Sequence, residues 1–341
     1  MVPTGLSQAR DKAGRIRVPE LRCQVTMSRR VAFACMLLAA IAFPARAAPP
    51  LLTPAELAAR TANPEVRVID IRDAAAYANQ HIPGAVSAPY GAWRGPAGNP
   101  GELPALPKLT ALVQRLGLTP QTHAVVVSSG ADATDFGASA RVYWTLKVLG
   151  LKELSVLNGG MAAWAAAGLP QDSVVPTVAA STYSPTLDAG LVATRDELVA
   201  LVGTGKATLV DARPAAFYHG ETRHQAAKVP GTLKGAVNVE HATWFRPGTS
   251  TFVSADEARK LAAAAPLDPA RDTVSFCNTG HWAATNWFAL SEVLGEKQVK
   301  LYPGSMVDWT QDPAALPMDH VPNRIEQLAI DFRLWVARTF D

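Results

Sequence analysis

The sequence predicts an α/β protein of two small domains of the same kind, each a parallel sheet covered by helices on both faces. Three observations predict this fold. The length of 341 residues suits two domains. Continuous apolar strands alternate with helical segments, which is typical of a buried parallel sheet. The second half of the chain also repeats the pattern of the first.

The first 47 residues have the order of a secretory signal peptide. Arg29 and Arg30 form a short basic region, residues 31–43 are an unbroken apolar run, and residues 45–47 form a small-x-small cleavage site. We therefore expect cleavage before Ala48 and a periplasmic location. The apolar run is too short to span a bilayer, so no stable membrane anchor is expected after processing.

Removal of this segment changes the charge and the cysteine count. Residues 1–47 hold eight basic and two acidic residues, so the net charge passes from +3 to −3 without them. The basic character that would favour nucleic acid is then absent. Cys23 and Cys35 are removed as well, which leaves Cys277 as the sole cysteine. Such a residue is either a small buried hydrophobe or a thiol kept for chemistry.

Four short segments of the first half recur in the same order in the second half. An apolar run ending in Asp-x-Arg stands at 68–72 and 209–213, and a Thr-x-x-Glu capping box stands at 53–56 and 194–197, both at an offset of 141 residues. A Pro-Gly and Gly-Ala-Val segment at 81–86 returns at 229–237, and a Gly-x-Met-x-x-Trp segment at 159–164 returns at 304–309. The order and spacing indicate an internal duplication.

Each half is expected to begin with the capped helix and the Asp-x-Arg strand. After more helix, a second buried strand is expected at 124–128 and 273–277, then a helix ending at Gly150 or Gly295, then a strand at 154–157 or 299–302. The Ser-, Thr- and Pro-rich segment 171–190 is interpreted as an extended linker. The predicted domains are 48–172 and 191–320, separated by a linker at 173–190, with a terminal helix over 321–341.

The terminal helix has one apolar side. We expect this side to pack on the body of the protein rather than to bind a partner. Its residues are Ile325, Leu328, Ala329, Phe332 and Trp335.

The segment from Ser275 to Ala283 is the most informative in the chain. An apolar strand is expected to end at Cys277, a loop containing Gly280 follows, and a helix is expected to run from about Ala283 to Leu294. This order places the sulfur at the carboxyl edge of a parallel sheet, where open α/β sheets bind ligands. Loop amides and the helix N-terminus favour negative charge there, and the thiolate is the nucleophilic form of cysteine. Cys277 is therefore the predicted catalytic nucleophile.

The duplicated Asp-x-Arg strand, the His-Ile-Pro-Gly-Ala segment at 81–85 and the Cys-x-x-Gly loop resemble the tandem-domain rhodanese sulfurtransferases over about residues 52–320. The resemblance implies two rhodanese-like domains, of which the N-terminal one is inactive and the C-terminal one is catalytic. It also implies a persulfide on Cys277 and a small anionic sulfur donor, thiosulfate or 3-mercaptopyruvate. The partners it implies are that donor and a small acceptor such as cyanide or a thiol, with no cofactor.

The loop departs from the family patterns. Asn278 and Thr279 stand where thiosulfate enzymes of the family carry a cationic pair, and His281 and Trp282 make the far side bulkier. The predicted substrate-binding loop nevertheless comprises Asn278, Thr279, Gly280, His281, Trp282 and Ala283.

Residues outside the loop are expected to support it. Arg213, next to Asp211, is predicted to brace the loop rather than to touch substrate. Phe217 stands near the place where family members often carry an arginine. His219, Arg223 and His224 either replace the missing positive charge or are solvated loop residues.

The counterpart loop in the first half, 127–137, has no cysteine, and we expect it to be longer than the catalytic loop. Ser128 is a weak nucleophile without an adjacent base, so this half is interpreted as a wall of the pocket. Two other functions stay open. A phosphatase-type loop would need an arginine where Ala283 stands, and a non-enzymatic sulfur carrier could use the same loop. No metal-ligand spacing is present.

Overall fold

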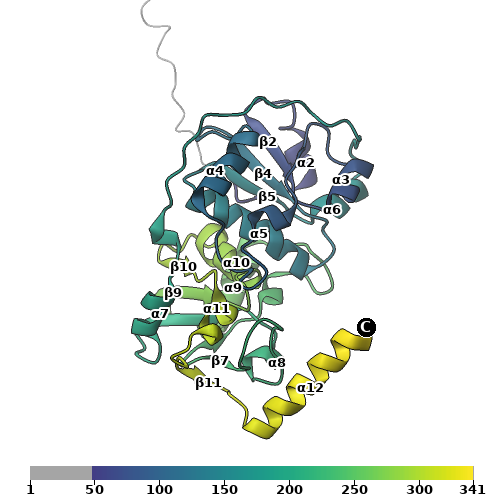
Figure 1. Cartoon of the computed structure of the whole chain (residues 1–341). Helices are drawn as coiled ribbons and strands as arrows, with labels where there is room; N and C mark the ends of the chain where they lie inside the picture. The colour runs from purple at the N-terminus through teal and green to yellow at the C-terminus, as the bar shows by residue number, and fades with distance from the viewer. Residues whose placement is uncertain (1–47, 341) are drawn as a thin grey trace, which may run out of the picture. The chain divides into compact units, whose positions relative to one another are not determined.

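The computed structural model describes residues 48–340, so the expected signal peptide and cleavage site lie outside the described residues. The N-terminal half forms a five-stranded parallel sheet in the order β1-β5-β4-β2-β3 (Figure 1). Its strands are β1 (Leu51–Leu52), β2 (Val66–Asp70), β3 (Val86–Ser87), β4 (His123–Val127) and β5 (Leu154–Leu157).

The C-terminal half forms a four-stranded parallel sheet in the order β10-β9-β6-β8. Its strands are β6 (Ala207–Asp211), β8 (Val237–Asn238), β9 (Asp272–Phe276) and β10 (Val299–Leu301). A separate antiparallel pair joins β7 (Thr232–Leu233) to β11 (Met318–Asp319). The register of β6 and β9 sets Asp211 opposite Phe276, so the Asp-x-Arg motif begins beside the residue that precedes Cys277.

The helices repeat between the halves as the strands do. The N-terminal set is α2 (Pro54–Ala58), α3 (Ala74–Asn79), the 3₁₀ turn η2 (Tyr90–Trp93), α4 (Leu106–Arg115), α5 (Ala133–Val148) and α6 (Gly160–Ala166). The C-terminal set is α7 (Arg195–Leu201), α8 (Ala215–Tyr218), the 3₁₀ turn η4 (His241–Trp244), α9 (Ala255–Ala264), α10 (Trp282–Trp287) with its π-helical continuation η5 (Phe288–Val293), and α11 (Ser305–Gln311). A short 3₁₀ turn, η3 (Ala189–Leu191), ends the linker, which is otherwise without helix or strand.

Both predicted capping boxes are present. Thr53 and Glu56 cap α2 reciprocally, and Thr194 and Glu197 cap α7. A third box, formed by Ser254 and Glu257 on α9, was not predicted.

Both faces of each sheet are covered by helices, which confirms the predicted fold class. Successive residues of β4 show this, because Val125 and Val127 pack with α2 and α6 whereas Ala124 and Val126 pack with α4 and α5. In the other half, Leu209 packs with α7 and α11 and Val210 packs on the opposite face.

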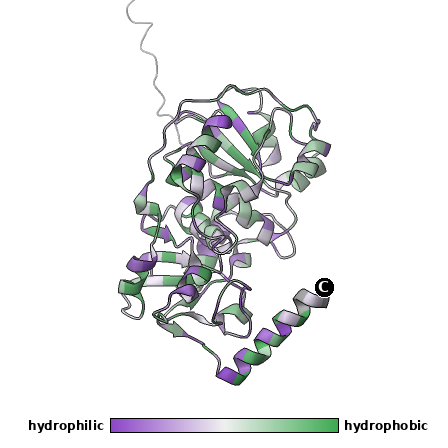
Figure 2. Cartoon of the chain, viewed as in Figure 1, coloured by the Kyte–Doolittle hydropathy of each residue, from purple (hydrophilic) through white to green (hydrophobic). Residues whose placement is uncertain are grey.

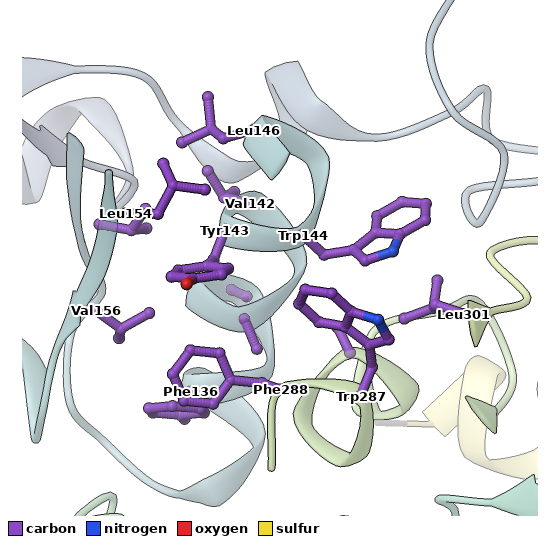
Figure 3. Packing of buried hydrophobic residues seen from close by; sticks show 14 of the residues in the cluster. Phe136, Val142, Tyr143, Trp144, Leu146, Leu154, Val156, Trp287, Phe288 and Leu301 are labelled. Carbon is purple, nitrogen blue, oxygen red and sulfur yellow. The ribbon is translucent and has the colours of Figure 1, made fainter. Parts of the chain in front are cut away.

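The largest hydrophobic cluster contains residues of both halves. Phe136 and Tyr143 of α5 meet Phe288 of η5 at ring-centroid distances of 5.5 and 5.1 Å (Figure 3). Trp144 and Trp287 lie beside them in the same cluster. The two halves therefore share a core, and this core holds α5 against the helix that follows the catalytic loop.

The terminal helix α12 (Arg324–Phe340) exists, but the expectation that its apolar side packs on the body is wrong. Ile325, Leu328 and Phe332 are 79, 58 and 64% exposed, and Ile330 is the only buried one among the helix residues whose side chains the structure describes. Figure 2 shows hydrophobic and hydrophilic residues alternating along this helix. An ion pair between Arg223 and Asp331, at 2.8 Å, ties the helix through a different side. Over the described residues, no helix is both long enough and apolar enough to cross a membrane.

Candidate active site

Cys277 is the first residue after β9, which ends at Phe276, one position before the predicted end at Cys277. The residue is 1% exposed, so its thiol is enclosed by protein. The carbonyl groups of Cys277 and Asn278 accept from the N–H groups of Met306 and Val307, both at 3.0 Å. These two bonds fix the start of the loop on α11.

Ser305 holds the loop from inside and was missed by the sequence analysis. Its Oγ accepts from the N–H groups of Cys277 at 3.0 Å and Gly280 at 3.1 Å, and donates to the carbonyl of Tyr302 at 2.8 Å. The residue is fully buried and has a φ of +53°, which is unfavourable for any residue with a side chain. The signal lay in the repeat, where Gly160 stands in the corresponding place with a φ of +56°.

The hydrogen bonds to Ser305 change which loop amides are free to bind an anion. We expected the amides from Asn278 to Ala283 to face the sulfur, but the Gly280 amide is bound by Ser305. The amides of Asn278, Thr279 and His281 have no acceptor among the described residues. These three remain available to an anion at the sulfur.

Arg213 does contact the loop. Its guanidinium pairs with Asp211 through two nitrogens, at 2.6 to 3.1 Å, and also donates to the side-chain oxygen of Asn278 at 3.3 Å and to the carbonyl of Gly231 at 2.7 Å. Both charged groups are buried, but each neutralises the other. Arg213 therefore positions Asn278 and leaves little net charge at the loop.

His281 links the loop to the N-terminal half. Its Nε2 lies 2.8 Å from the carbonyl of Thr134, which can only accept, so Nε2 carries the proton and Nδ1 accepts from the Tyr90 hydroxyl at 2.8 Å. Burial, with repulsion from Arg94, lowers the pKa of His281 to about 4. The imidazole is neutral at ordinary pH and acts as a connector, not as a cation.

Trp282 closes the far side of the loop with aromatic groups. Its ring stacks on His241 at a centroid distance of 4.9 Å and an angle of 11°, and it meets the edge of Phe217 at 5.9 Å. Burial also lowers the pKa of His241 to about 4, so this neighbour is neutral too.

The three residues proposed as alternative cations do not supply the charge. Arg223 donates hydrogen bonds to the carboxylate of Asp331 and to the carbonyl of Ala227. The His219 ring packs at a tilt of 38° against His320, at a centroid distance of 5.3 Å, and burial lowers the pKa of His224, with Arg94 repelling its protonated form. The positive charge next to the loop comes instead from two arginines of the N-terminal half, Arg94 and Arg141, which sequence analysis missed.

The corresponding loop of the N-terminal half is not longer, which corrects that expectation. It runs from Ser128 to Asp132, five residues, as the catalytic loop does from Cys277 to His281. The helix begins earlier than the sequence suggested, because the Asp132 side chain accepts from the Asp135 N–H and caps it. A pocket of about 240 Å³ lies at this loop; its lining includes Ser128, Ser129, Arg72, Tyr90 and His281.

Among residues 48–340, no group of three or more histidine, cysteine, aspartate or glutamate side chains is arranged to hold a metal ion. The chemistry of the described site rests on the thiol, the loop amides and the arginines.

Comparison with known families decides the identity. The model of the rhodanese-like domain matches the chain twice, at residues 53–167 and 194–312. The chain belongs to the rhodanese-like domain family. This tandem rhodanese is 33% identical to a thiosulfate sulfurtransferase of Pseudomonas aeruginosa over 267 residues, which cover 78% of this chain and 95% of that protein.

Two other similarities bear on function. A sulfur carrier protein of Thermus thermophilus, TtuD, is 30% identical over 72% of this chain and 88% of its own length. The solved structure of SseA from Escherichia coli, described as a 3-mercaptopyruvate sulfotransferase, is similar with a TM-score of 0.67 and 25% identity, covering 75% of this chain and 98% of that one. The resemblance found in the sequence is thus confirmed at the level of the family and the fold.

Proposed function

We propose that this rhodanese is a thiosulfate sulfurtransferase that carries the transferred sulfur as a persulfide on Cys277. The observation that carries the proposal is the enclosed thiol at the carboxyl end of β9, in a loop of which three amides have no acceptor among the described residues. The thiosulfate sulfurtransferase of Pseudomonas aeruginosa, which this chain covers almost completely, supports the choice of donor.

The reaction divides into two displacements. The Cys277 thiolate attacks the outer sulfur of thiosulfate, the sulfur–sulfur bond of the donor breaks, and sulfite leaves with the electron pair. Cyanide then attacks the outer sulfur of the persulfide, thiocyanate leaves, and the thiolate is restored. No external oxidant or reductant is needed, and a covalent intermediate of this kind predicts ping-pong kinetics.

The surroundings of the thiol suit small reactants. Both the free thiolate and the persulfide place a negative charge at the loop, first on the Cys277 sulfur and then on the outer sulfur, where the amides of Asn278, Thr279 and His281 can stabilise it. Cys277 is 1% exposed, and a persulfide extends outward by only about 2 Å. This favours a small acceptor over a protein partner.

The test is a donor panel with mass detection. Thiosulfate should add one sulfur atom to the full chain at Cys277, and initial rates with cyanide should give parallel lines in double-reciprocal plots. Cys277→Ser should lose both the added mass and turnover while its circular dichroism is retained. Undiminished transfer by that variant would show that another residue carries the sulfur.

Two other functions are separated by the same panel. The similarity to the Escherichia coli enzyme makes 3-mercaptopyruvate the alternative donor, in which case pyruvate would form faster than sulfite. The similarity to the Thermus thermophilus carrier suggests a persulfide that forms but turns over poorly with small acceptors. A persulfide without multiple turnover would favour the carrier.

We further propose that the protein is exported to the periplasm and cleaved before Ala48, leaving no stable membrane anchor. The basic, apolar and small-residue order of residues 29–47 supports this. N-terminal sequencing of protein from the periplasmic fraction should begin at Ala48. Cytoplasmic protein that retains the apolar run would contradict the proposal.

A further inference from the structure

Two arginines of the N-terminal half reach the backbone of the catalytic loop. Arg94, just after η2, donates to the carbonyl of Thr279 at 2.9 Å. Arg141, on α5, donates to the carbonyls of Gly280 at 3.2 Å and Gly101 at 2.7 Å. Arg141 also lies within electrostatic reach of Cys277.

Neither arginine has a carboxylate partner within the described part of the chain. Arg141 is 0% exposed, and its Nε has no hydrogen-bond partner there; the same is true of the buried Nη1 of Arg94. Arg213 shows the usual arrangement, since it is equally buried but paired with Asp211 at 2.6 Å. Burial and repulsion from Arg94 lower the pKa of Arg141 to about 9. Unpaired buried charge of this kind is costly for stability and is typical of functional sites.

We propose that Arg94 and Arg141 are positioning residues that hold the catalytic loop open to an anion and supply the positive charge that the loop itself lacks. The anion is the thiolate or persulfide of Cys277 together with the anionic group of the sulfur donor. This inference rests on the proposed sulfur transfer, and it assigns the N-terminal half an electrostatic role in that reaction.

The planarity of the peptide group explains the positioning. In a trans peptide the carbonyl and the following N–H point in opposite directions, and the described residues contain no cis peptide. The Thr279–Gly280 peptide is held by Arg94 at its oxygen and by Ser305 at its nitrogen. The Gly280–His281 peptide is held by Arg141 at its oxygen, so its N–H is turned away from the arginine and stays unpaired.

Close packing at Gly280 supports a fixed arrangement. Its φ is +66°, and a Cβ atom there would lie 2.4 Å from the Arg141 guanidinium. The arginine therefore sits directly against the loop backbone. The charged or titratable groups that surround the loop from the elements packed on it are Tyr90, Arg94, Arg141, Asp211, Arg213, His224, His241, His281 and Asp308.

Three variants of the full chain test the proposal. Arg94→Met removes one hydrogen bond and one charge at a half-buried position, and Arg141→Lys retains the charge of Arg141 but loses its forked geometry. Arg67→Met is the matched control, because Arg67 also has a buried Nε without a partner in the described structure but lies on β2, opposite Ala124 of β4 and outside the loop. The rate of Cys277 alkylation by iodoacetamide is measured from pH 5 to 10, and kcat and KM are measured with thiosulfate.

For Arg94→Met we expect the midpoint pH of alkylation to rise by about one unit, which lowers the alkylation rate about tenfold at pH values below the wild-type midpoint. Arg141→Lys should leave that midpoint nearly unchanged and lower kcat by about tenfold, since charge remains but the peptide is released. Arg67→Met should change neither quantity.

An Arg94→Met variant that folds, with the wild-type alkylation profile and with kcat/KM within twofold of wild type, would overturn the proposal. A shift as large in Arg67→Met would also overturn it, by showing a general charge effect. Alkylation requires no sulfur donor. A wild-type chain inactive with thiosulfate would therefore refute the proposed function and leave the alkylation comparison valid.

Discussion

The loops that follow β4 and β9 have the same length but opposite provision for negative charge. In the N-terminal loop, the Gly130 N–H donates to the carboxylate of Asp135 at 2.6 Å, so an anion is built into the chain. In the catalytic loop, the first turn of α10 has no acidic residue, and the amides of Thr279 and His281 have no acceptor in the described structure. A carboxylate of the chain occupies the Gly130 amide, whereas the Thr279 amide at the same loop position is left for an external anion.

The two loops also differ in the residue that packs behind them, which is Gly160 in the N-terminal half and Ser305 in the catalytic half. Gly160 lies so close to the inactive loop that a Cβ would be 2.6 Å from the Ser128 carbonyl and from the Gly130 nitrogen. Ser305, with a similar positive φ, instead places a hydroxyl between two amides of the catalytic loop. The comparison teaches that catalytic competence requires more than the cysteine. It requires an open amide cradle, a serine that shapes it and charge from the other half.

The largest expected effect follows from moving the thiol between the loops. The double variant Cys277→Ser/Ser128→Cys should show less than about 1% of wild-type transfer, because the Asp135 carboxylate repels a thiolate at position 128 and occupies an amide that would stabilise it. The measurement is thiosulfate-dependent transfer together with the persulfide mass. Restored transfer would show that a cysteine alone distinguishes the two halves.

The next effect concerns Ser305. Ser305→Gly copies the inactive half, relieves the positive φ and leaves the amides of Cys277 and Gly280 without their acceptor. A buried unpaired amide costs about 1–3 kcal/mol, so kcat should fall roughly ten- to a hundredfold. Ser139→Ala is the control, because Ser139 is fully buried and its Oγ has no hydrogen-bond partner among residues 48–340. Equal losses in both variants would assign the effect to packing in general.

The features that could be predicted from the sequence are those that recur in both halves or that depend on neighbouring residues. The capping boxes, the Asp-x-Arg strands and Cys277 at a strand end are patterns of neighbouring residues, and the bounds of the predicted strands moved by two positions at most. Arg94 and Arg141 could not be found in this way. They lie 185 and 139 residues along the chain from the carbonyls that they bind. They stand out because no carboxylate of the described residues pairs with them, and the folded structure is needed to see this.

The prediction of how the terminal helix packs was wrong for a related reason. Its periodic apolar side predicts a helix correctly, but periodicity does not say which surface covers that side. The ion pair of Asp331 with Arg223 determines its attachment, and no local pattern marks that pair.

A smaller effect, on the pH dependence of stability, comes from a difference between the two 3₁₀ turns. Tyr90 begins η2 and His241 begins η4, and the N–H group of each donates to a carbonyl just after the Asp-x-Arg strand, at 2.9 Å. Because burial holds the pKa of His241 near 4, the unfolded chain binds the proton more readily between about pH 4 and 6.5. The free energy of unfolding should therefore fall as the pH drops through that range.

Urea unfolding at pH 7 and pH 5 measures this effect. His241→Asn should reduce the difference in midpoint between the two pH values, because one group with a depressed pKa is removed. His281 has a similar shift and should retain part of the difference. An unchanged difference in His241→Asn would show that His241 does not contribute to the pH dependence.

The smallest expected effect compares the two capping boxes. Thr53→Ala and Thr194→Ala each remove the side chain that accepts from the third residue of α2 or α7, so each should lower stability by about 1 kcal/mol. The two helices lie in different halves, but Phe136 and Phe288 belong to one shared cluster. We therefore expect both substitutions to shift the same cooperative urea transition.

The double variant completes this test. Distant caps without shared partners should add, which gives about 2 kcal/mol for Thr53→Ala/Thr194→Ala. Ser181→Ala in the linker serves as the control, because its half-buried side chain caps no helix. If circular dichroism and tryptophan fluorescence resolved two transitions, each shifted by only one of the substitutions, the halves would unfold independently. The shared core would then not couple the N-terminal half to the catalytic loop as the packing of α5 on α10 and η5 indicates.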